Sequence, residues 1–141
     1  MVLTPVACAK CGFVAGLGSC VLCAGVLPTR PIASFAVGEQ EMNRTIGATS
    51  FIWLSRGLTR DYKTPGTRGH VDIVACFTKP GTVLLHWQEN PEHPDYWVSR
   101  QVRRELEAAV DSKGRKLEII ELPAPAALRG HDGDWADYSY V

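Results

Sequence analysis

An apolar stripe at helical spacing constrains the fold of this chain most. Between residues 95 and 114, apolar side chains recur at intervals of 4, 4, 3 and 1 positions, which places them on one face of an α-helix. Asp95 is expected as the N-cap of this helix and Gly114 as its C-cap. The members of the stripe are Val98, Val102, Leu106, Ala109 and Val110.

Short apolar runs rich in branched and aromatic residues flank this helix and predict β-strands. Pro80-Gly81 predicts a tight turn between two of them. The order of elements over residues 70–122 is β-β-α-β, which indicates an α/β or α+β domain. The predicted strands are residues 50–54, 70–77, 83–87 and 117–122, and residues 138–141 also have a strand-like sequence.

The composition suits one globular domain of 141 residues. Fifteen basic and fifteen acidic residues cancel, so no attraction to nucleic acid or to acidic membranes is indicated. The longest uncharged apolar run, residues 13–27, is shorter than the roughly 20 residues of a membrane span. We therefore expect a cytoplasmic protein. Residues 1–45 are a Cys-rich apolar segment whose structure the pattern does not indicate, and residues 46–141 hold the predicted elements.

Four cysteines in the N-terminal segment form two C-x2-C pairs, Cys8 with Cys11 and Cys20 with Cys23. Four thiolates with this pairing can surround a tetrahedral zinc ion, although the connection between the pairs is short for a zinc ribbon. Residues 17–20 also resemble a lipoprotein signal, but the apolar run continues past Cys20. A third interpretation, a misplaced start or a shifted reading frame without designed structure, best fits the composition of residues 1–38, which contain no acidic residue.

Gly69-His70-Val71-Asp72 is the sharpest candidate for chemistry. Side chains two positions apart on a strand share one face, so His70 and Asp72 would lie together. The carboxylate can bind a cation and the imidazole can transfer a proton near neutral pH. Gly69 would let a ligand or another backbone approach closely. The alternative is a histidine at a loop edge with a neighbouring carboxylate and no function.

No other residue pattern predicts a nucleophile or a ligand set. A rise of about 3.3 Å per residue puts Cys76 about 20 Å from His70 along a strand, beyond the reach of a catalytic pair, so Cys76 is expected to be a core thiol. His86 is expected at the edge of the core or on the surface. His93 and His131 are isolated in the sequence.

An ordered series of motifs over residues 50–141 resembles the middle of the agmatine deiminases (agmatine iminohydrolases), in the peptidylarginine-deiminase-like family of the guanidine-modifying superfamily. This resemblance implies a five-bladed α/β propeller of ββαβ modules, of which the chain would supply one to two blades. The series is Ile52-Trp53-Leu54, Arg56-Gly57-Leu58, Asp61, Gly69-His70-Val71-Asp72, Pro80-Gly81, Val83-Leu84-Leu85, the turn from Asp111 to Arg115, Leu122-Pro123-Ala124-Pro125 and Tyr138-Ser139-Tyr140.

In that family a cysteine attacks the guanidinium carbon of agmatine, ammonia leaves, and water hydrolyses the amidino-cysteine to N-carbamoylputrescine. The resemblance assigns His70 as the general acid and base, and Asp72 as the carboxylate that pairs with the planar guanidinium. Asp61 and Gly69 match loop positions near the substrate. It implies a small-molecule substrate, agmatine or another guanidine, and no metal or organic cofactor.

The sequence also departs from the family. The nucleophilic cysteine of the family stands in a G-G-G-x-x-H-C stretch that does not occur here, and an upstream E-G-G motif has no counterpart in residues 1–49. We therefore expect a deiminase fragment without efficient turnover of its own. Two alternatives stay open. One is a small zinc-binding or interaction module that uses the N-terminal cysteines. The other is a β-β-α-β protein that associates through an open sheet edge with further copies or a complementary fragment.

Overall fold

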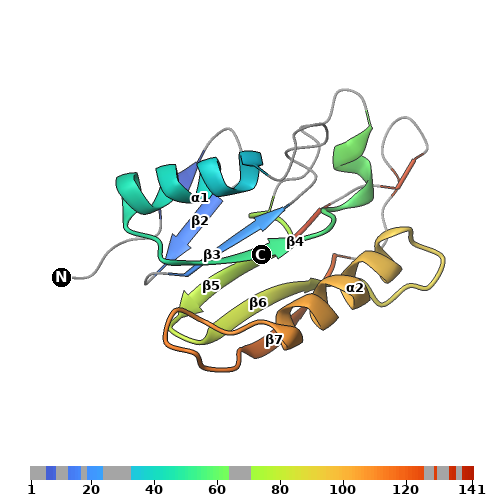
Figure 1. Ribbon diagram of the computed structural model, residues 1–141. Coiled ribbons are helices and arrows are strands. Elements are labelled where there is room, and N and C mark those ends of the chain that lie inside the picture. The colour runs from blue at the N-terminus through green and yellow to red at the C-terminus, as the bar shows by residue number, and fades with distance from the viewer. Residues whose placement is uncertain are drawn as a thin grey trace.

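The computed structural model describes residues 6–8, 13–16, 19–23, 33–63, 71–125, 129, 134–135 and 138–141, which contain two β-sheets and two α-helices (Figure 1). The four-stranded sheet has the order β1 (Val6–Cys8), β2 (Phe13–Gly16), β3 (Ser19–Cys23) and β4 (Ser50–Leu54). The three-stranded sheet has the order β5 (Ala75–Lys79), β6 (Thr82–Trp87) and β7 (Glu118–Pro123). The helices are α1 (Ala33–Ile46) and α2 (Asp95–Ala108), and η2 (Thr59–Tyr62) is a 3₁₀ turn. None of the described helices is long and apolar enough to span a membrane.

The four-stranded sheet contains elements that the sequence pattern does not predict. β1, β2 and β3 are antiparallel in succession, and β3 pairs in parallel with β4, the predicted strand 50–54. A parallel pair needs a crossover connection, and α1 provides it, lying across one face of the sheet (Figure 1). The carboxylate of Glu39 on α1 accepts a hydrogen bond of 2.6 Å from the indole nitrogen of Trp53 on β4. The division of the chain into residues 1–45 and 46–141 stays a prediction.

The three-stranded sheet confirms the β-β-α-β order and the α/β class. β5 and β6 form the predicted hairpin, with Gly81 at φ +80°, a conformation that glycine adopts without steric strain. α2 then crosses back, and β7 pairs in parallel with β6. Figure 1 shows α2 running beside β6 and β7, and it contacts both strands.

Two strand predictions are wrong, one at its start and one altogether. The strand predicted over residues 70–77 begins only at Ala75. The carbonyl of Val71 accepts hydrogen bonds from the amides of Val74 and Ala75, both at 2.9 Å, so residues 71–74 form a turn that leads into β5. Residues 138–141 are strand-like in sequence but belong to no strand of the structure.

Helix α2 buries Val98, Val102 and Leu106 of the predicted apolar face, but its ends differ from the prediction. Ala109 and Val110 lie beyond the helix, and Val110 is exposed. Asp95 lies inside the helix as its first residue, so its prediction as N-cap is wrong. The helix ends at Ala108 because Ala109 has an extended backbone, and it does not reach Gly114. Gly114, at φ +75°, belongs instead to a separate turn after the helix.

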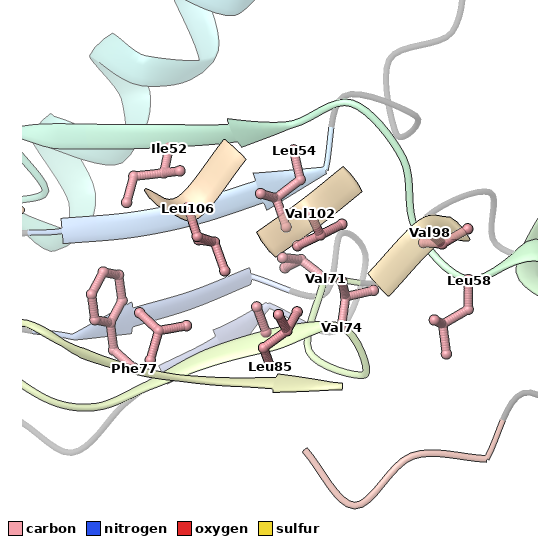
Figure 2. Close-up of a cluster of buried hydrophobic side chains, with 12 residues drawn as sticks. Ile52, Leu54, Leu58, Val71, Val74, Phe77, Leu85, Val98, Val102 and Leu106 are labelled. Carbon is pink, nitrogen blue, oxygen red and sulfur yellow. The ribbon is translucent and has the colours of Figure 1, made fainter. Parts of the chain in front are cut away.

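The hydrophobic core lies between β4, the three-stranded sheet and α2. Figure 2 shows side chains from these elements pointing toward one another. Alternate residues of β6, Val83 and Leu85, face this core, as expected for a strand with one buried face. The buried cluster contains Ile52, Leu54, Leu58, Val71, Val74, Ala75, Phe77, Val83, Leu85, Val98, Val102 and Leu106.

The opposite face of the three-stranded sheet carries an apolar row. Cys76 pairs with Leu84 across β5 and β6, and Leu84 pairs with Ile120 across β6 and β7. Cys76 and Leu84 are half-buried, and Ile120 is exposed. The described residues therefore leave part of this apolar row open to solvent.

A charged turn closes the connection between α2 and β7. Asp111 accepts hydrogen bonds from the amides of Lys113 at 2.9 Å and Arg115 at 3.0 Å, and from the Arg115 Nε at 2.7 Å. The hydrogen bond from the Arg115 side chain is the main cause that lowers the pKa of Asp111 to about 2. The carboxylate of Asp111 is thus a structural cap for this turn.

Replacing Leu106 by alanine should reduce the free energy of unfolding by about 2–5 kcal/mol, because it leaves a cavity in the buried cluster. Ile120→Ala, at an exposed position, should reduce the free energy of unfolding by only a small fraction of that amount. Urea denaturation measures this free energy for the two variants. Equal losses would show that the core does not lie where the structure places it.

Asp111→Asn should make thermal stability less dependent on pH. The pKa of Asp111 falls from an ordinary 3.8 to about 2 on folding, so its stabilisation is complete above pH 3.8 and is lost as the pH falls toward 2. The difference in Tm between wild type and Asp111→Asn should be largest at neutral pH and should narrow between about pH 4 and pH 2. Calorimetry at several pH values measures it, and a constant difference would contradict the role of the ionised carboxylate.

Candidate functional site

Asp72 is held in the turn that leads into β5. The residues on either side of this turn are anchored, since Val71 and Val74 are both buried in the core. The amide of His86 on β6 donates a hydrogen bond of 2.8 Å to the carbonyl of Val74. The backbone that carries Asp72 is therefore fixed by packing on one side and by a cross-strand hydrogen bond on the other.

The carboxylate of Asp72 has an oxygen that the protein does not satisfy. Asp72 is half-buried, and within the described part of the chain its Oδ1 is buried without a hydrogen-bond partner. A buried acceptor without a donor costs about 1–3 kcal/mol, more when the group is charged. Such an atom is uncommon in native proteins and needs a reason, and a ligand with N–H donors would supply one.

Asp61 is buried in the 3₁₀ turn η2, with 7% of its surface exposed. Its amide donates a hydrogen bond of 3.2 Å to the carbonyl of Leu58. Leu58 and Val71 are both fully buried and belong to the same cluster (Figure 2). The segments that carry Asp61 and Asp72 therefore leave one common core.

Gly69 and His70 lie outside the described residues, so their predicted roles stay predictions. Asp72 lies in a turn and not in a strand, so the prediction that His70 and Asp72 share one strand face is wrong. His131 also lies outside the described residues.

Cys76 lies on β5, as expected, but is half-buried rather than fully buried. Burial raises the pKa of its thiol. A raised pKa lowers the thiolate fraction at neutral pH, and the thiolate is the nucleophilic form. This finding agrees with the exclusion of Cys76 as a nucleophile.

The structure does not support the zinc interpretation of the N-terminal cysteines. Cys20 and Cys23 belong to one continuous strand, β3, instead of the knuckle turn that a C-x2-C zinc site would use. Among the described residues, no group of three or more His, Cys, Asp or Glu residues could hold a metal ion. Cys11 and the thiols of Cys8, Cys20 and Cys23 lie outside what the structure describes.

Sequence reasoning missed a buried polar pair beside η2. His93 and Asp95 are 3% and 1% exposed, with 3.7 Å between the His93 Nδ1 and the Asp95 Oδ2. The Asp95 Oδ1 accepts a hydrogen bond of 2.7 Å from the amide of Thr59, the first residue of η2. The sequence offers only a weak signal for this pair, a histidine and an aspartate around Pro94 at the start of a helix. His86, in contrast, is buried at the sheet, as expected for a residue at the core edge.

Comparisons with known proteins agree on one family. A sequence profile described as Porphyromonas-type peptidyl-arginine deiminase matches residues 28–141. A Streptomyces coelicolor protein, provisionally named an agmatine deiminase, is 48% identical over 103 residues, which are 73% of this chain and 30% of that protein. The agmatine deiminase of Medicago truncatula is 36% identical over 116 residues, 80% of this chain and 30% of that protein.

Solved structures of agmatine deiminases share the fold. That of Enterococcus faecalis superposes with a TM-score of 0.71 at 24% identity, over 92% of this chain and 38% of that chain. That of C. jejuni, solved with substrate bound, gives a TM-score of 0.67 at 21% identity, over 87% of this chain and 35% of that chain. The chain spans about 30% of the length of the relatives that it matches by sequence.

Alkylation by iodoacetamide should be slow at Cys76 in the native protein at pH 7, because the raised pKa leaves little thiolate. Peptide mapping by mass spectrometry separates Cys76 from the other four cysteines. The labelling rate of Cys76 in the urea-unfolded protein is the control. Native labelling as fast as in urea would reopen Cys76 as a reactive thiol.

Proposed function

This chain belongs to the Porphyromonas-type peptidyl-arginine deiminase family, and we propose that its residues 46–141 supply the guanidinium-binding side of an agmatine deiminase active site. The observation that carries the proposal is the buried Oδ1 of Asp72, which has no hydrogen-bond partner among the described residues. Agmatine would provide the missing donors.

A guanidinium group suits this carboxylate for geometric and electrostatic reasons. The group is planar, remains charged, and presents N–H donors in a fork that matches a carboxylate. A hydrogen bond between charged groups contributes about 1.5–3 kcal/mol. The bound guanidinium would therefore offset the desolvation of Asp72, and we propose that the buried carboxylate of Asp61 adds negative charge to the same site.

The catalytic steps follow from the family resemblance. A cysteine sulfur would form a bond to the guanidinium carbon, and His70 would protonate the departing ammonia. The same imidazole would then take a proton from the water that hydrolyses the amidino-cysteine, releasing N-carbamoylputrescine. The G-G-G-x-x-H-C stretch of the family does not occur within these 141 residues, so their own contribution is to bind the guanidine and to transfer protons through His70.

We propose a five-bladed propeller as the complete fold. Its support in this chain is the β-β-α-β unit and the apolar row of Cys76, Leu84 and Ile120 on the outer face of the three-stranded sheet. Large apolar side chains that line up across a sheet commonly pack against another element. Further ββαβ modules would cover this face.

Agmatine should bind the purified chain weakly through Asp72, and NMR titration of backbone amides measures the dissociation constant. Asp72→Asn should weaken binding about ten- to hundredfold, because it removes the charge that pairs with the guanidinium. Asp111→Asn is the matched control, since that buried carboxylate already has Arg115 as its partner.

Putrescine, which carries an amine in place of the guanidinium, is the control ligand. Equal affinity for agmatine and putrescine, or equal agmatine affinity of wild type and Asp72→Asn, would rule out guanidinium recognition by Asp72.

A further inference from the structure

The carboxylate of Asp95 serves a neighbouring element rather than its own helix. A carboxylate at the start of a helix commonly accepts hydrogen bonds from the first amides of that helix. Here the Asp95 Oδ1 instead accepts a hydrogen bond of 2.7 Å from the amide of Thr59, across 36 positions of sequence. Asp95 therefore acts as an N-terminal cap for η2, whose preceding residue, Leu58, has no capping side chain.

His93, rather than the Asp95 side chain, accepts a hydrogen bond from an amide at the start of α2. The amide of Asp95 donates a hydrogen bond of 3.1 Å to the His93 Nδ1. The Nδ1 lone pair of His93 therefore faces the Asp95 amide. The two side chains thus work as a pair. His93 accepts the hydrogen bond of the Asp95 amide, and the Asp95 carboxylate accepts the hydrogen bond of the Thr59 amide.

The turn η2 depends on such outside contacts. A single 3₁₀ turn is too short to be stable by its own hydrogen bonds. Trp135 adds two further contacts. Its indole ring packs against the ring of His93 with the centroids 5.0 Å apart, and its backbone carbonyl accepts a hydrogen bond of 3.2 Å from the side chain of Arg60. An ion pair between Lys63 and Asp134 lies beside them.

We propose that His93 and Asp95 are positioning residues that hold η2, and with it Asp61, in place for guanidinium binding. Thr59 and Asp61 are two positions apart in the same turn, so a shift of the Thr59 amide moves the backbone of Asp61. The inference rests on the proposed function of Asp61 and Asp72, because its test measures how these carboxylates bind guanidine.

Two substitutions of Asp95 separate positioning from stability. Asp95→Ala removes the acceptor for Thr59, whereas Asp95→Asn keeps an oxygen at the Oδ1 position. Asp111→Asn is the matched control, because it destabilises the turn after α2 without touching the core cluster or the Thr59 hydrogen bond. NMR measures the exchange rates of the Thr59 and Asp61 amides and the agmatine dissociation constant, and calorimetry measures Tm.

Asp95→Ala should raise the agmatine dissociation constant about tenfold and speed exchange of the Thr59 amide by a similar factor. Asp95→Asn should keep both the agmatine dissociation constant and the exchange rate of the Thr59 amide close to the wild-type values. Asp111→Asn should lower Tm at neutral pH while leaving the dissociation constant unchanged. An Asp95→Ala protein that loses stability like Asp111→Asn but keeps wild-type binding and exchange would overturn the proposal.

His93 provides a second pair of variants if Asp95→Ala does not fold. His93→Ala removes the acceptor for the Asp95 amide, and His93→Asn restores one near the Nδ1 position. Binding should weaken in the first and recover in the second, and equal binding would refute the positioning role. If wild type binds no agmatine, the guanidinium site and the positioning role both fail. The Thr59 exchange rates would then still show whether Asp95 holds η2.

Discussion

The shared burial of Leu58 and Val71 is the constraint on which the candidate site depends. Each residue is fully buried in one cluster, and each stands shortly before a carboxylate of interest, Asp61 or Asp72. Protein interiors are close-packed, so backbone anchored there cannot shift without opening a cavity or forcing a clash. The core therefore sets where the two acidic segments leave it, although neither carboxylate is part of the core.

The carboxylates of Asp111 and Asp72 show how structural and binding roles differ. Asp111 accepts hydrogen bonds from two amides and from Arg115, and its pKa falls to about 2. Asp72 stands in an equally well-anchored turn, yet its Oδ1 lacks a partner within the described chain. The first carboxylate completes a local turn. The second retains an acceptor for a ligand, at a cost in stability that binding would offset.

The sequence pattern predicted best where local rules and burial agree. The hairpin around Pro80-Gly81 and the buried face of α2 follow from turn chemistry and helical periodicity, and both are confirmed. The prediction failed where hydrogen bonds override propensity: the Val71 carbonyl closes a turn although its neighbours are branched residues typical of strands. Helix α1 was missed because residues 33–46 carry glycine and no clear apolar stripe in the described part.

The sequence by itself determined the β-β-α-β unit, the family and the candidate residues. Short-range periodicity indicates the first, and an ordered series of motifs indicates the other two. Only the tertiary structure decided which polar groups have partners. The hydrogen bond from Thr59 to Asp95 joins residues 36 positions apart. Whether the Oδ1 of Asp72 has a hydrogen-bond partner among the described residues likewise depends on which groups lie around it in space. Such partnerships depend on how elements pack, and local sequence patterns carry no record of that packing.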